Sequence, residues 1–73
     1  MEIPDYVIII EPLSAEDGGG FLARIPDLPG CASDGDTDVE ALHNAHDAIR
    51  AWIKQAQAMN RPIPRPSIQR QYA

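Results

Sequence analysis

Cys31, His43 and His46 are the side chains in this sequence with the strongest claim to chemistry. A lone cysteine becomes a nucleophile when a basic group lowers its pKa, but no charged residue adjoins Cys31 in the sequence. His43 and His46 are three residues apart, which would let them share a metal ion on a helix. No third ligand accompanies them. The sequence therefore favours a small buried Cys31, no metal site and no cofactor.

Acidic side chains gather in the middle of the chain. They are Asp27, Asp34, Asp36, Asp38 and Glu40. Converging carboxylates hold two magnesium ions in metal-dependent nucleases, so a divergent nuclease is one alternative. A turn accounts for Asp27 and a helix start for Asp36, Asp38 and Glu40 more simply. We therefore predict that the chain is not an enzyme.

Residues 35–58 predict one long amphipathic helix, which the other elements must pack against. Thr37 caps its start, and Glu40 reaches back to the backbone amide of the cap. Pro62 stops the helix near Met59 or Asn60. Apolar residues at helical spacing predict the buried stripe, which consists of Val39, Leu42, Ala45, Ile49, Trp52, Ile53 and Ala56.

Three short strands precede the helix, at residues 6–11, 21–25 and 31–34. The first is rich in β-branched residues and is apolar on both faces. Glycines 18–20 supply the positive-φ positions of a hairpin, so the second strand is expected to run antiparallel to the first. A stiff corner follows the second strand, formed by Pro26, Asp27, Leu28, Pro29, Gly30 and Cys31.

These elements predict an α+β fold in which one helix covers one face of a small antiparallel sheet of three to four strands. Residues 1–73 are expected to form one domain, in which residues 61–73 are an extended Pro-rich tail whose end could add an edge strand. The uncovered face of the sheet would include Val7, Ile9 and Leu22. Because exposed apolar surface usually marks an interface, we predict a homo-oligomer that buries these three residues.

The charge balance restricts the partners. Eleven acidic residues against six basic ones give a net charge of −5, which repels phosphate backbones and favours basic partners. No basic leader sequence and no long apolar run are present, so we expect a cytoplasmic protein without a membrane segment. The single cysteine rules out an internal disulfide.

An ordered series of motifs resembles the HicB antitoxin family over roughly residues 6–67. These motifs are residues 6–10, the Gly-Gly-Phe entry to the second strand, residues 25–31, Gly35-Asp36-Thr37, Glu40-Ala41-Leu42, Asn44-Ala45, Ala48-Ile49 and residues 63–67. The resemblance implies a reduced ribonuclease H-like fold that has lost the catalytic carboxylates. It also implies a partner, HicA, which is a small basic toxin that cleaves messenger RNA.

The motif residues, including Gly35, Thr37 and Glu40, are expected to specify the fold and not the contact with a toxin. We select Arg24, Asp34 and Asp36 as candidate toxin-binding residues. Many family members continue into a DNA-binding segment, which does not follow Ala73, so no DNA binding is expected from this chain alone. A stand-alone dimeric binding module with a partner that is not a toxin is the other alternative.

Overall fold

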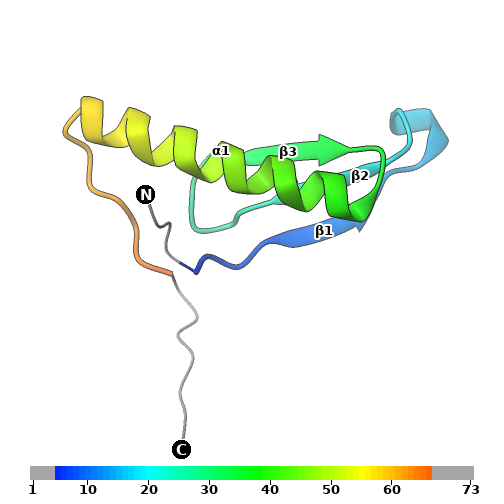
Figure 1. Ribbon diagram of the computed structural model, residues 1–73, viewed down its shortest axis with the longest axis horizontal. Coiled ribbons are helices and arrows are strands. Elements are labelled where there is room, and N and C mark those ends of the chain that lie inside the picture. The colour runs from blue at the N-terminus through cyan, green and yellow to red at the C-terminus, as the bar shows by residue number, and fades with distance from the viewer. Residues whose placement is uncertain (1–4, 67–73) are drawn as a thin grey trace, which may run out of the picture.

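The computed structural model describes residues 5–66, which form a three-stranded antiparallel sheet with one long helix across one face (Figure 1). The elements are β1 (Ile9–Pro12), a 3-10 turn η1 (Ala15–Asp17), β2 (Phe21–Arg24), β3 (Ala32–Gly35) and α1 (Asp38–Ala58). The strand order in space is β1-β2-β3. The predicted α+β class is confirmed, and the edge strand predicted beyond residue 66 lies outside the described residues.

The first hairpin begins later than predicted. β1 starts at Ile9, which pairs with Arg24, the last residue of β2. The N–H of Leu13 donates to the carbonyl oxygen of Gly20 at 2.8 Å. From this pair onward, residue pairs that exchange hydrogen bonds alternate with pairs that exchange none. Pro12 consequently lies at a pair that exchanges no hydrogen bonds. Its missing N–H therefore costs the sheet nothing, and the strand extends through it.

The corner between β2 and β3 is held by its own backbone and by one core side chain. The N–H of Leu28 donates to the oxygen of Ile25 at 3.1 Å, and the N–H of Cys31 donates to the oxygen of Leu28 at 2.9 Å. Leu28 is only 1% exposed, so the corner is anchored in the core. Gly30 has φ +75°, a conformation that glycine adopts without strain. The Trp52 indole N–H donates to the oxygen of Pro29 at 2.9 Å and ties the corner to the helix.

The start of α1 matches the predicted cap. The Thr37 hydroxyl accepts a hydrogen bond from the N–H of Glu40 at 3.1 Å. The Glu40 carboxylate accepts from the N–H of Asp36 at 3.3 Å, one residue before the cap and not from the cap residue itself. The two reciprocal bonds satisfy amides that would otherwise have no partner at the helix start.

The buried face of α1 is rotated from the predicted stripe. The fully buried helix residues are Ala41, Ala45, Ile49, Ile53 and Ala56. Val39 is 72% exposed and Leu42 is 37% exposed, so their placement in the core was wrong. The reason is a close approach: a Cβ at Gly35 would lie 2.5 Å from the backbone nitrogen of Ala41. Only small residues fit where helix and strand are this close, so Ala41 faces the sheet in place of Leu42.

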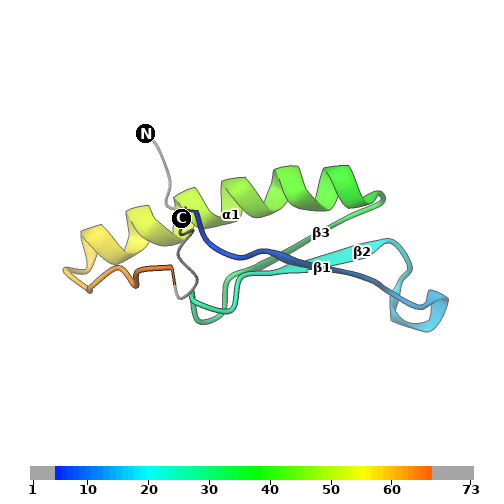
Figure 2. The ribbon, with the colours of Figure 1, turned by 90° about the horizontal axis from the view of Figure 1, so that it is seen from below.

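The core lies between α1 and the sheet face that carries Ala23 and Ile25. Figure 2 shows α1 on one side of the sheet, with no described element covering the other side. Residues 61–66 leave the helix without helix or strand and return toward the beginning of the chain. There the Tyr6 hydroxyl donates a hydrogen bond to the carbonyl oxygen of Pro64, and Ile63 packs against the core.

Candidate protein-binding surface

The candidate nucleophile, Cys31, is buried. Cys31 is 7% exposed and packs in the core, and burial raises the pKa of its thiol above the usual value. A raised pKa keeps the thiol protonated and poorly nucleophilic at neutral pH. Cys31 therefore serves packing in this structure.

The two histidines and the carboxylates do not assemble a metal site in residues 5–66. No group of three or more His, Cys, Asp or Glu side chains in this part of the chain is placed to hold an ion. The ring of His43 lies 3.9 Å from the Asp47 carboxylate, on the solvent side of the helix. Two of the candidate magnesium ligands serve the helix start, because Asp38 accepts from the N–H of Val39 at 2.8 Å and Glu40 binds as described above.

The sheet face that points away from α1 is covered by no helix or strand of residues 5–66 (Figure 2). We call it the outer face. Because paired residues share a face, the register places Ile9 beside Arg24 and Leu22 beside Asp34 on this surface. Val7 joins them by alternation with Tyr6 and Ile8, both of which pack on the opposite side. Val7, Ile9 and Leu22 are each half-buried, although no element covers them.

Polar groups border this apolar centre. Arg24 and Glu11 form an ion pair of 2.8 Å across the two strands, with about half of each side chain exposed. Asp34 is exposed on β3, and Asp36 is exposed in the turn that leads into α1. An ion pair this exposed contributes only ~0–1 kcal/mol to stability, so it orients two charges without fixing the fold.

The structure therefore brings five of the six predicted interface residues together. Val7, Ile9, Leu22, Arg24 and Asp34 share the outer face, and Asp36 adjoins it. The predicted oligomer interface and the predicted toxin contact thus fall on one surface, which cannot serve both partners at once. Glu11 also lies on the outer face but was not among the predicted interface residues. It could have been included, because it lies two positions after Ile9 on the expected strand.

Acidic residues concentrate at one end of the molecule, where β1 and β3 end and α1 begins, on the right in Figure 1. They are all exposed and comprise Glu11, Glu16, Asp17, Asp34, Asp36, Asp38 and Glu40. The basic residues Lys54, Arg61 and Arg65 lie in the last turns of α1 and the segment after it. Carboxylates are therefore concentrated at the first of these ends, whereas the other end carries both signs of charge, since it also includes Asp5 and Asp27.

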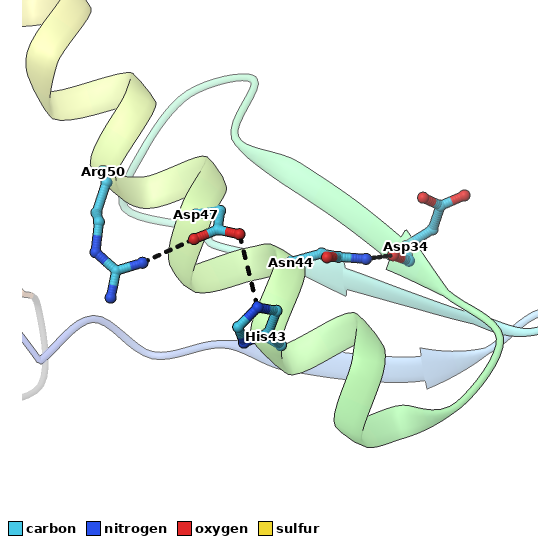
Figure 3. A network of polar contacts seen from close by, with 5 residues as sticks. All are labelled: Asp34, His43, Asn44, Asp47 and Arg50. Atoms are coloured by element: carbon cyan, nitrogen blue, oxygen red, sulfur yellow. Dashed lines mark hydrogen bonds and ion pairs between the residues drawn. The ribbon is translucent and has the colours of Figure 1, made fainter.

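A polar side of α1 carries side chains that bond to one another or to β3 (Figure 3). Arg50 donates to Asp47 at 2.8 Å, one helical turn away, and Asn44 donates to the backbone oxygen of Asp34 at 2.8 Å. These bonds are local to the helix or tie it to β3. They leave this surface with a structural role.

Comparison with known proteins places the chain in a family. The model of the HicB-like antitoxins of bacterial toxin-antitoxin systems matches residues 6–73. A UPF0150 protein of Thermoplasma acidophilum is 40% identical over 60 residues, which cover 82% of this chain and 83% of the relative. A UPF0150 protein of Synechocystis is 36% identical over 67 residues, covering 92% of this chain and 81% of the relative.

A third relative is longer. An uncharacterized 14.9 kDa protein of Haemophilus phage HP1 is 36% identical over 67 residues, which are 92% of this chain but 47% of the phage protein. No solved structure is significantly similar to this chain.

The described residues form a small α+β domain with a covered sheet face, an open sheet face and an acidic end. This chain belongs to the HicB-like antitoxin family. In residues 5–66 no helix has the length and apolar character needed to cross a membrane.

Proposed function

We propose that this chain is the antitoxin of a type II toxin-antitoxin system, which binds and inhibits a small basic HicA-like toxin that cleaves messenger RNA. Membership of the HicB-like antitoxin family is the observation that carries the proposal. On this proposal the protein has no catalytic activity, uses no cofactor and acts in the cytoplasm. The order of three antiparallel strands and a covering helix is compatible with a reduced ribonuclease H-like fold, which we include in the proposal.

The outer face and the acidic end supply the contact in this proposal. A toxin that binds RNA must present positive charge to the phosphates, so an acidic surface competes for the same groups. The net charge of −5 and the carboxylates of Asp34 and Asp36 favour encounter with such a partner. The same net charge opposes phosphate binding, so we propose that these 73 residues alone do not bind DNA.

Charge alone does not hold the complex together. Exposed ion pairs are worth only ~0–1 kcal/mol each, whereas apolar groups at the centre of an interface carry most of its affinity. Ile9 and Leu22 provide such a centre, and Arg24, Asp34 and Asp36 provide its polar rim. The contact is therefore proposed to be apolar in the middle and charged at the edge.

Co-expression with a small basic HicA-like toxin tests the proposal. The antitoxin should restore growth and keep messenger RNA intact. Replacing Leu22 by Lys puts a charge in the apolar centre and should weaken toxin binding at least tenfold. Replacing Ala51 by Lys adds the same charge on an exposed part of α1 and should leave binding unchanged. Circular dichroism verifies that both variants are folded.

A second pair of variants isolates the electrostatic part. Asp34→Asn and Asp47→Asn each remove one negative charge, but only Asp34 lies on the outer face. Asp34→Asn should slow association, whereas Asp47→Asn should not. Added salt should slow association more than it speeds dissociation, because steering acts on encounter.

Full toxicity of that HicA-like protein in the presence of abundant, folded antitoxin would contradict the proposal. A dimeric binding module with a different partner would then take its place. Cleavage of RNA by this chain with magnesium would instead support the nuclease alternative.

A further inference from the structure

A pocket lies between the second half of α1 and the corner that joins β2 to β3. Its lining residues are Pro29, Trp52, Gln55, Ala56, Met59 and Arg61. The Trp52 indole N–H donates to the backbone oxygen of Pro29 at 2.9 Å, which fixes the ring as one wall. Ala56 is only 3% exposed, whereas Met59 is 49% exposed, so the pocket extends from buried helix surface to solvent. None of the lining residues belongs to the outer face.

The pocket has the size of one side chain. Its volume is about 170 Å³. Sites for cofactors and metabolites usually enclose about 300–1,000 Å³, whereas a cavity of about 150 Å³ holds a benzene ring. The size therefore favours the anchoring side chain of a protein partner over a whole small-molecule ligand. Trp52, Met59 and Arg61 also belong to the residue types that are enriched in protein interfaces.

The charge at the pocket selects the kind of partner. Among the described residues that line it, Arg61 alone carries a charge. The Arg61 guanidinium makes no ion pair or hydrogen bond within residues 5–66. A carboxylate brought to the pocket can therefore pair with this cation, although the net charge of −5 disfavours carboxylates over the molecule as a whole. Trp52 and Met59 offer apolar contact to a side chain beside that carboxylate.

We propose that this pocket binds an acidic segment of a partner protein, which inserts an aliphatic side chain against Trp52 and places a neighbouring carboxylate on Arg61. An exposed ion pair alone is worth little, so the inserted side chain supplies the affinity and Arg61 supplies the choice of charge. A basic toxin would meet a like charge at Arg61, so this partner is a different protein. Because the pocket and the outer face share no residue, both partners can be bound at once.

Fluorescence of Trp52 tests the proposal, because it is the single tryptophan of the chain. The probe is an acetylated and amidated peptide with the sequence Gly-Asp-Leu-Asp-Gly, added to the full chain. It should shift the emission of Trp52 saturably. It should also bind at least fivefold tighter than two control peptides. Gly-Lys-Leu-Lys-Gly reverses the charge, and Gly-Asp-Ala-Asp-Gly removes the inserted side chain.

Matched variants test the contribution of Arg61. Arg61→Gln removes the cation that lines the pocket and should weaken binding of the Gly-Asp-Leu-Asp-Gly peptide at least fivefold. Lys54→Gln removes a positive charge from an exposed position of α1 outside the pocket and should weaken binding less than twofold. Circular dichroism verifies that both variants are folded. Equal weakening by the two variants would mean that the peptide responds only to overall charge, and would overturn the proposal.

Acrylamide quenching tests whether the pocket is open. Acrylamide should quench Trp52 in the free protein, and should quench it less when the peptide is bound. A Trp52 that acrylamide cannot reach would mean that the chain fills its own pocket, and an emission that shifts with protein concentration would mean that a second copy fills it. Either result, or equal binding of the three peptides, would overturn the proposal. Toxin inhibition does not enter these measurements, so this inference and the antitoxin proposal can fail separately.

Discussion

The side-chain amide of Asn44 donates a hydrogen bond of 2.8 Å to the backbone oxygen of Asp34 (Figure 3). The backbone oxygen of Cys31 accepts a hydrogen bond from the Ile25 N–H at 3.1 Å. Along β3, backbone groups point alternately toward β2 and away from it, so the Asp34 carbonyl, three residues after Cys31, points away from β2. Asn44 therefore satisfies the Asp34 carbonyl oxygen, which would otherwise be free to accept a hydrogen bond from another strand. One side chain both fastens the helix to the sheet and closes a sheet edge.

Replacing Asn44 by Ala should lower the free energy of unfolding by about 1 kcal/mol, the usual net worth of such a hydrogen bond. Urea denaturation followed by circular dichroism measures the change. Gln57→Ala, at an exposed helix position, serves as the control and should have little effect. Equal effects of the two substitutions would show that the bond to Asp34 contributes nothing.

The helix cap provides a second prediction. Thr37→Ala removes the acceptor for the Glu40 amide and should cost about 1 kcal/mol of stability. Thr37→Ser keeps a hydroxyl at the same place and should recover most of that loss. The midpoint of chemical denaturation reports both, and an unchanged midpoint in Thr37→Ala would contradict the role of the cap.

The contact between Gly35 and the helix should tolerate no side chain. A Cβ at Gly35 would lie 2.5 Å from the Ala41 nitrogen, so Gly35→Ala must push helix and strand apart, at a cost of about 3 kcal/mol. Gly30→Ala is the matched control, since its Cβ would meet nothing within 4 Å and only its positive φ is penalised. That penalty is about 1 kcal/mol. The Tm of Gly35→Ala should therefore lie well below the Tm of Gly30→Ala. The reverse order would refute the close-packing argument.

Stability should fall in alkaline solution because of Tyr6. Burial, and secondarily the charge of Asp27, raises the pKa of the Tyr6 hydroxyl above its value in the unfolded chain. The folded state consequently holds this proton at a pH where the unfolded state releases it. The stabilisation is complete below about pH 10, where an unfolded tyrosine titrates, and is lost as the pH rises further.

Tyr6→Phe isolates this effect. The variant loses the hydrogen bond to Pro64, which should cost about 1 kcal/mol at pH 8. Between pH 8 and pH 10.5 it should lose less stability than the wild type, because Cys31 titrates in both proteins and Tyr6 in only one. Parallel losses in the two proteins, measured by urea denaturation, would exclude Tyr6 as the source.

Local signals in the sequence were enough to predict the helix and the strands, and to predict which residues face the core on most of them. The Thr37 cap marks the beginning of α1 because capping depends on residues a few positions apart. Alternation along the first strand separates Ile8 and Ile10 from Val7 and Ile9. The same alternation, continued on β2, identified Leu22 as a residue of the uncovered face.

The rotation of the helix could not be predicted in this way. Val39 and Leu42 fit the apolar stripe by spacing, but a contact between residues of two elements, Gly35 and Ala41, decides which side of α1 reaches the sheet. Such a contact leaves no periodic trace in either segment. The bounds of β1 likewise depend on where β2 ends, since a strand extends only as far as its partner does.

The order of the strands bears on how quickly the chain folds. β1 pairs with β2 and β2 with β3, each the next strand along the sequence, and α1 then packs on the strand that precedes it. Such local pairings keep the loops that must close short, and small mixed domains of this kind fold on the order of milliseconds. The contact of Tyr6 with Pro64 spans nearly the whole described chain, so it is expected to form last. A newly synthesised molecule would thus present its open sheet face almost as soon as the helix leaves the ribosome.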